Sequence, residues 1–164
     1  MSQTRFINPQ TLGKPPGYTH VVEVTAPGRI VYIAGQLGVD RDGKVVGDFQ
    51  RQAVQTFENL KTALAAVGAQ FRHVVKLNNY LVDRADLPTF REVRDSYLAE
   101  NDRPASTTIA ISGLAREGAL IEIEAVAVLP AATRAKAAAK PGSKSAGKAR
   151  SARSPRRRAR AKRR

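Results

Sequence analysis

Residues 103–128 read RPASTTIAISGLAREGALIEIEAVAV, and the fold that we predict for the chain rests on the pattern of these residues. It contains two runs of strand composition joined by a short polar connection with a glycine. In the second run, apolar residues alternate with Glu122 and Glu124, and side chains two residues apart lie on the same face of a strand. The pattern predicts strands at 106–112 and 119–129, the second with one apolar face and one face that carries carboxylates.

The formal charge of +14 is confined to the C-terminal part of the chain. All 14 Asp and Glu residues and half of the 28 Lys and Arg residues precede residue 131, so residues 1–130 are formally neutral. This length suits one domain with a single core. We therefore predict a domain at 1–130 followed by a basic tail at 131–164. The chain has no cysteine, which excludes disulfides, thiolate nucleophiles and cysteine-ligated metal sites.

The N-terminal residues give no sign of export. They lack the basic and then apolar pattern of a signal peptide, and no apolar run in the chain approaches the length that spans a membrane. We expect a soluble, cytoplasmic protein without a membrane partner.

The residues before position 48 predict a β-hairpin. Residues 1–16 are interpreted as an arm or loop. Strands at 20–25 and 29–34 would pair around the turn Ala26-Pro27-Gly28, because proline presets φ and glycine accepts positive φ. A second tight turn is predicted at Asp42-Gly43.

Two helices and a strand are predicted between positions 48 and 104. Asp48 would cap a first helix that ends at Gly68, with apolar residues at three- and four-residue steps. A strand follows at 74–82. Asp86 would cap a second helix that stops near Asn101.

This order of elements predicts an α+β fold with a single sheet and two helices on one face. The other face would carry apolar side chains such as Tyr32, Val126 and Val128, and the chain has no further apolar element to cover it. We therefore predict self-association through the open face.

Four short motifs resemble those of the Rid family, the reactive intermediate deaminases also called the YjgF family. The resemblance extends over residues 12–129. The motifs are Gly17-Tyr18-Thr19-His20, Ala34-Gly35-Gln36, Pro104-Ala105-Ser106 and Ile121-Glu122-Ile123-Glu124-Ala125. The resemblance implies a chorismate-mutase-like fold assembled as a homotrimer with a central barrel, with small-molecule clefts between subunits and no cofactor. His20 and His73 are too far apart in the sequence to suggest a metal site.

The best-known activity of the family is hydrolysis of reactive enamines and imines to 2-oxo acids and ammonia. The resemblance implies that Glu122 orients the attacking water. The family arginine that holds the substrate carboxylate is replaced here by Ser106. A serine hydroxyl offers a carboxylate one neutral hydrogen-bond donor, whereas the guanidinium of arginine offers it two charged donors. We therefore expect an altered substrate and weak turnover of ordinary imino acids. Arg91 and Arg103 are candidate replacements, although both could be solvated surface groups.

The remaining candidate ligand-binding residues are Tyr18, Gly35, Thr107 and Thr108, together with Ser106 itself. Each has a structural alternative: a sheet-edge aromatic for Tyr18, a plain bend for Gly35, and ordinary strand positions for the threonines. Glu124 shares a face with Glu122 and could form a pair between subunits. Some relatives have been described as ribonucleases, but nothing in this chain resembles a dedicated nuclease site.

The tail is of low complexity and lacks every large apolar residue, so we expect it to be disordered. The tail has 14 Lys and Arg residues and no Asp or Glu. This composition is typical of sequence-independent binding to nucleic acid through the phosphate groups. The alternative function is therefore a non-catalytic Rid-fold binding protein tethered to nucleic acid and associated with the nucleoid; the tail could also be a dispensable extension. The candidate contacts are Arg156, Arg157, Arg158, Arg160, Lys162, Arg163 and Arg164.

Overall fold

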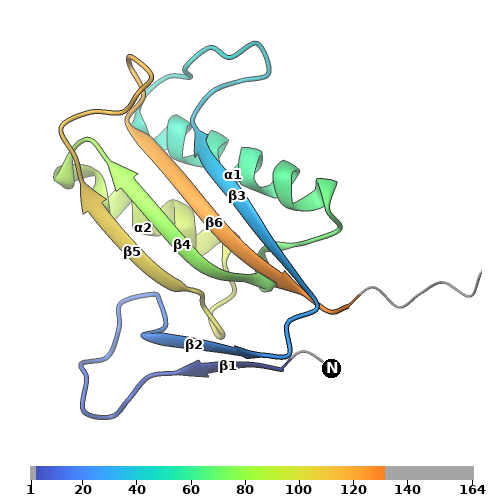
Figure 1. Ribbon diagram of the computed structural model, residues 1–164. Helices are drawn as coiled ribbons and strands as arrows, with labels where there is room; N and C mark the ends of the chain where they lie inside the picture. Colours follow the sequence, from blue (N-terminus) through green and yellow to red (C-terminus); the bar gives the residue numbers. More distant parts are fainter. Residues whose placement is uncertain (1–2, 132–164) are drawn as a thin grey trace, which may run out of the picture. The chain divides into compact units, whose positions relative to one another are not determined.

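Strand β6 (Ile121–Leu129) is the centre of the sheet in the computed structural model, which describes residues 3–131 (Figure 1). Its odd-numbered residues are buried and its even-numbered residues are half-buried along the whole strand. Glu122 and Glu124 therefore lie on the opposite face from Ile121 and Ile123, which are fully buried. The two-faced strand predicted from the sequence is confirmed.

The main sheet has the strand order β3-β6-β4-β5, with β3 at Arg29–Leu37, β4 at Val74–Leu81 and β5 at Ala105–Ala110. β6 pairs antiparallel with β3 and with β4, whereas β5 is parallel to β4. The two strands of the opening motif are thus not neighbours, because β4 lies between them. β3 and β5 are left as the two edges of the sheet.

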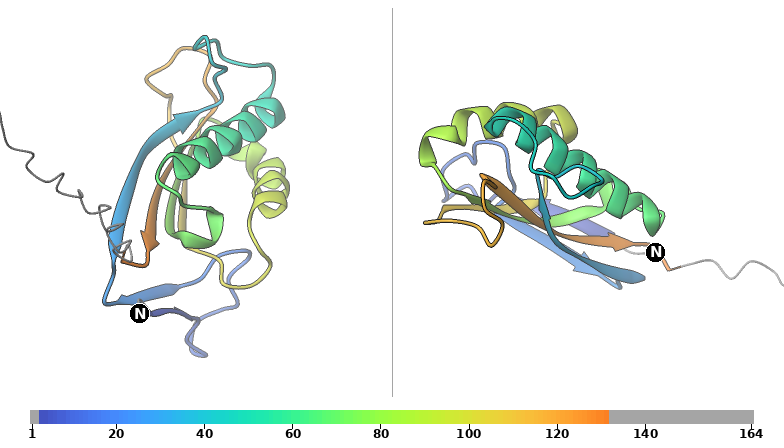
Figure 2. Two further views of the ribbon diagram at one scale, coloured as in Figure 1. Left: turned by 90° about the vertical axis from the view of Figure 1, so that its right-hand side faces the viewer. Right: turned by 90° about the horizontal axis from the view of Figure 1, so that it is seen from above.

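Both helices cover the same face of this sheet, as predicted (Figure 2). Helix α1 (Phe49–Ala66) begins at Asp48, whose carboxylate accepts a hydrogen bond from Arg51 N at 3.0 Å. The 3₁₀ turns η1 (Phe71–His73) and η2 (Arg84–Asp86) precede β4 and helix α2 (Leu87–Tyr97), respectively. The helices pack on the sheet through a core centred on Phe57 and Phe90, both fully buried.

Two predictions about α2 need correction. Asp86 occupies the cap position, but its side chain makes no capping hydrogen bond. Asp83 performs the capping one turn earlier, where its carboxylate accepts from Ala85 N at 2.8 Å and starts η2. The helix also ends at Tyr97 rather than near Asn101, since Leu98 already has an extended backbone.

The predicted N-terminal hairpin is wrong. β2 (Val21–Thr25) pairs antiparallel with β1 (Gln3–Ile7), a segment interpreted from the sequence as an arm or loop, and β3 belongs to the main sheet. The turn after β2 contains Ala26 with φ +50°, and it leads the chain from one sheet into the other. β1 has only five residues and its few apolar side chains precede Asn8-Pro9, so its strand signal was weak. The turn predicted at Asp42-Gly43 is present, because Val39 and Val45 bridge across it.

The second face of the main sheet is covered by no helix from the described part of the chain (Figure 2). Tyr32 is 78% exposed there and Ile30 is 50% exposed. Within residues 3–131 no helix is long and apolar enough to cross a membrane. The basic tail and its candidate nucleic-acid contacts lie outside the described residues.

Candidate active site

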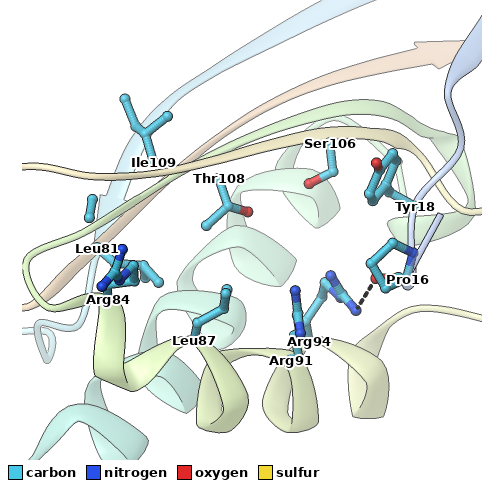
Figure 3. A pocket seen from close by; sticks show the side chains of 11 residues that line it. Pro16, Tyr18, Leu81, Arg84, Leu87, Arg91, Arg94, Ser106, Thr108 and Ile109 are labelled. Carbon is cyan, nitrogen blue, oxygen red and sulfur yellow. Dashed lines mark hydrogen bonds between the residues drawn. The ribbon is translucent and has the colours of Figure 1, made fainter. Parts of the chain in front are cut away.

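A cavity of about 420 Å³ lies between edge strand β5 and helix α2 (Figure 3). Side chains of Ser106 and Thr108 face it from the strand, because residues two apart share a face. The helix side is lined by Arg84, Leu87, Arg91 and Arg94, and Pro16 and Tyr18 close one end. A larger groove of about 700 Å³ at the C-terminal ends of the helices has Lys61 as the one charged group among its described lining residues. Convergent polar groups therefore favour the β5–α2 cavity as the ligand site.

The hydroxyl groups in this cavity are held from behind by Asn79 of β4. Asn79 is 1% exposed, and its Nδ2 donates to Ser106 Oγ at 2.9 Å and to Thr108 Oγ1 at 3.1 Å. The same nitrogen lies 2.9 Å from Thr107 O, so the two amide hydrogens are shared among three acceptors. Because both hydroxyl oxygens act as acceptors here, their protons remain available for a ligand. The structure thus places the Asn79 side chain beneath the cavity.

Helix α2 and the 3₁₀ turn η2 before it supply the positive charge of the cavity. Arg84 belongs to η2, whereas the steps of four and three residues between Leu87, Arg91 and Arg94 place these three side chains on the face of α2 that lines the cavity. Arg91 was predicted as a candidate replacement for the missing arginine, whereas Arg84 and Arg94 were not. The three-residue step from Arg91 to Arg94 along the predicted helix was a signal for Arg94, whereas Arg84 precedes the predicted helix and had no such signal.

The guanidinium of Arg94 is engaged by other residues of the chain and is not free to bind a ligand. It is 4% exposed, its Nε donates to Asp95 Oδ1 at 2.8 Å, and one Nη lies 3.5 Å from Pro16 O. Asp95 also pairs with Arg103, whose guanidinium donates to Gly17 O at 3.4 Å. These arginines therefore tie the segment that carries Tyr18 to the end of α2. Arg103 does not line the cavity.

The charge on Asp95 is stabilised by its two partners. Burial alone would raise the pKa of Asp95, but hydrogen bonds and attraction from Arg94 and then Arg103 outweigh burial and leave that pKa lowered. Gly17 sits between these groups with φ +89°, and a Cβ there would overlap an Arg94 Nη. Only glycine fits this position without displacing Arg94.

Gly35 and Glu122 form a second cluster on the other face of the sheet. The β3–β6 register shifts between Ile33 and Gln36, so Gly35 lies in a bulge of the edge strand. A Cβ added at Gly35 would overlap Glu122 Oε1. The structure thus brings these two predicted residues together, but it separates them from Tyr18 and Ser106 within one chain.

Thr107 and Glu124 also lie on the open face. Thr107 Oγ1 accepts a hydrogen bond from Lys76 Nζ at 2.7 Å. Thr107 thus points away from the cavity that its neighbours Ser106 and Thr108 line. Glu124 Oε2 accepts from Tyr80 Oη at 3.1 Å and lies 3.3 Å from Asn78 Nδ2. The pKa of Tyr80 is raised, first by its hydrogen bond to Glu124 and then by burial.

Comparison with known proteins identifies the family. The family model described as Endoribonuclease L-PSP matches residues 12–129 of the chain. This protein belongs to that family, the Rid or YjgF family. The Rid protein YyfB from Yersinia pestis is a solved structure with a TM-score of 0.70 and 36% identity, covering 77% of this chain and 98% of YyfB.

Two similar Rid-family relatives are deaminases. The chain is 31% identical to the 2-iminobutanoate/2-iminopropanoate deaminase of Dermatophagoides farinae, over 79% of this chain and 99% of the relative. It is 35% identical to the 3-aminoacrylate deaminase RutC of Acinetobacter baylyi strain ADP1, over 70% of this chain and 91% of the relative. The α+β fold with two helices on one face agrees with the solved Rid structures.

Proposed function

We propose that this Rid protein hydrolyses an enamine or imine to a carbonyl product and ammonia, with the substrate anion held by Arg91. The observation that carries the proposal is that Arg91 of α2 and Ser106 of β5 line the same cavity. Strand β5 has Ser106 in place of the family arginine, and Arg91 of the facing helix can supply the missing positive charge. A guanidinium can donate two parallel hydrogen bonds to a carboxylate.

The hydroxyl groups of Ser106 and Thr108 complement this cation. Asn79 fixes both oxygens as acceptors, so each hydroxyl can donate its proton to the bound anion or to a polar group near it. Tyr18 closes the same end of the cavity (Figure 3). These groups bind and orient the substrate.

Hydrolysis also needs an oriented water. In the proposed reaction, water adds to the imine carbon, the nitrogen takes up a proton, and cleavage of the carbon–nitrogen bond releases ammonia and leaves a carbonyl group. Glu122 is the proposed group that holds the water and accepts its proton. Within one chain, however, Glu122 and the cavity lie on opposite faces of the sheet.

A neighbouring copy would resolve this separation. The cavity borders edge strand β5, whereas Gly35 and Glu122 lie at β3 and its neighbour β6, towards the opposite edge. In a closed ring of copies, the β5 edge of one subunit can meet the β3 edge of the next, and the exposed Tyr32 face can turn towards the interior of the ring. The complete site that we propose therefore lies between subunits of a homotrimer.

Release of ammonia and 2-oxo acid from freshly generated 2-iminobutanoate tests the activity. The expected result is turnover above the uncatalysed rate, weaker than that of a Rid deaminase with arginine at the strand position, and largely lost in Arg91→Gln. Turnover that is unaffected by Arg91→Gln would contradict the role given to this residue. The absence of turnover with every imine and enamine tested would contradict the proposed function itself.

A further inference from the structure

The cavity between β5 and α2 has two cationic side chains along its helix side with one apolar side chain between them (Figure 3). Arg84 lies at one end, and Arg91 lies towards the end closed by Tyr18. Leu87 lies between the two arginines on the helix side. Arg84 lies in the 3₁₀ turn η2 and Arg91 in α2, so by the rise per residue of the two elements they are roughly 10 to 12 Å apart along the chain axis. A single small anionic group cannot contact both guanidinium groups closely unless the side chains fold towards one another.

Both arginines are available to a ligand. Among residues 3–131, the side chains of Arg84 and Arg91 form neither an ion pair nor a hydrogen bond with another described residue. No Asp or Glu of this range lines the cavity. Arg94, the third arginine of this face, already pairs with Asp95.

The acidic neighbours of Arg84 are directed elsewhere. Asp83 accepts from Ala85 N at 2.8 Å as the cap of η2. The pKa of Asp86 is raised, first by burial and then by Asp83, whereas a paired arginine would lower it. Neither of these acidic neighbours therefore neutralises the charge of Arg84.

We infer that the cavity binds compounds that carry two anionic groups separated by a short carbon chain. Arg91, with the Ser106 hydroxyl, holds the anion beside the reacting carbon, and Arg84 holds the distal anion. Leu87 contacts the chain between them. The inference rests on the proposed function and names its substrate class: imines or enamines of dicarboxylic amino acids.

Calorimetric titration of the full-length protein with glutarate, butyrate and inorganic phosphate at roughly 0.15 M salt tests this inference. Glutarate carries two separated carboxylates, butyrate carries one, and phosphate carries its charge in one compact group. We expect glutarate to bind about tenfold more tightly than butyrate, because one further charge-assisted contact is worth about that factor. Phosphate should bind no better than butyrate.

Three variants locate the effect. Arg84→Gln should reduce the affinity for glutarate to that for butyrate and leave butyrate binding unchanged, whereas Arg91→Gln should weaken the binding of both. Arg41→Gln is the matched control, because Arg41 is exposed and does not line the cavity. The basic tail is identical in all variants, so any anion binding by the tail cancels in the comparison.

The outcomes separate the inference from the proposed function. Equal affinities for glutarate and butyrate, tighter binding of phosphate than of glutarate, or an unchanged preference in Arg84→Gln would overturn the inference. If 2-iminobutanoate is nevertheless hydrolysed in an Arg91-dependent manner, the proposed function still stands. If glutarate is preferred through Arg84 but no imine or enamine is hydrolysed, the ligand class stands and the proposed function fails.

Discussion

The carboxylate of Glu122 lies over the backbone of Gly35, so close that a Cβ at position 35 would overlap Glu122 Oε1. The two residues come from neighbouring strands and meet where the bulge in β3 shifts the register. Any side chain at position 35 must therefore displace the carboxylate or the strand. This contact fixes where the proposed water-orienting group sits.

Replacement of Gly35 by alanine should move Glu122 and reduce turnover by a factor of about 10² or more, the usual contribution of a positioned general base. Steady-state kinetics would measure the loss, alongside that in Glu122→Gln. Gly113→Ala is the matched control, since a Cβ there meets no atom within 4 Å. Equal activity of Gly35→Ala and the unaltered protein would contradict the role of this contact.

Replacement of Asn79 by leucine should weaken substrate binding with little change in stability. Asn79 Oδ1 is buried without a hydrogen-bond partner among the described residues, so an apolar side chain removes an unsatisfied group as well as useful donors. We expect the free energy of unfolding to change by less than about 1 kcal/mol. The KM should rise, because the Ser106 and Thr108 hydroxyls lose their fixed orientation. Urea denaturation and kinetics check the two parts; a large loss of stability with unchanged KM would contradict this account.

The stability contributed by Asp95 should depend on pH. Its pKa is lowered in the folded protein, so the contribution is complete above the ordinary pKa of about 3.9 and is lost as pH falls through the folded value. Asp95→Asn should therefore be less stable than the unaltered protein at neutral pH, and the two should converge as the pH is lowered below about 4. Urea unfolding across this range measures the difference. A constant difference down to the lowest pH would contradict the assignment.

Removal of residues 131–164 should abolish binding to duplex DNA at low salt, because this segment carries the entire formal charge of +14. Fluorescence anisotropy at two salt concentrations measures the effect. Turnover of the imine substrate by the truncated protein serves as the control for an intact domain. DNA binding that is equally strong after truncation would contradict the tail assignment.

The sequence predicted the strands and helices of the main layer because their apolar periodicity is strong, as in β6 and α1. It missed β1, whose five residues carry a weak pattern, and it therefore paired β2 with the wrong neighbour. Turn chemistry around Pro27 specifies a change of direction, but not the sheet that the next strand joins.

The candidate site was only partly predictable for a similar reason. Motif positions led to Tyr18, Ser106 and Thr108, which lie around one cavity, and to Gly35 and Glu122, which lie together elsewhere. Asn79, Arg84 and Arg94 belong to no motif. Their roles depend on the parallel pairing of β4 with β5 and on the face that α2 turns to the strand, which are features of tertiary packing.

In the proposed trimer, Arg91 and Glu122 act in one site but come from different subunits. Arg91→Gln and Glu122→Gln should each be nearly inactive alone. If the two variants are refolded together in equal amounts, random assembly of a ring should restore about one quarter of the sites, because each site takes one residue from each of two neighbours. Turnover recovered to about that fraction is the predicted result; mixed assemblies that stay as inactive as the separate variants would contradict the account.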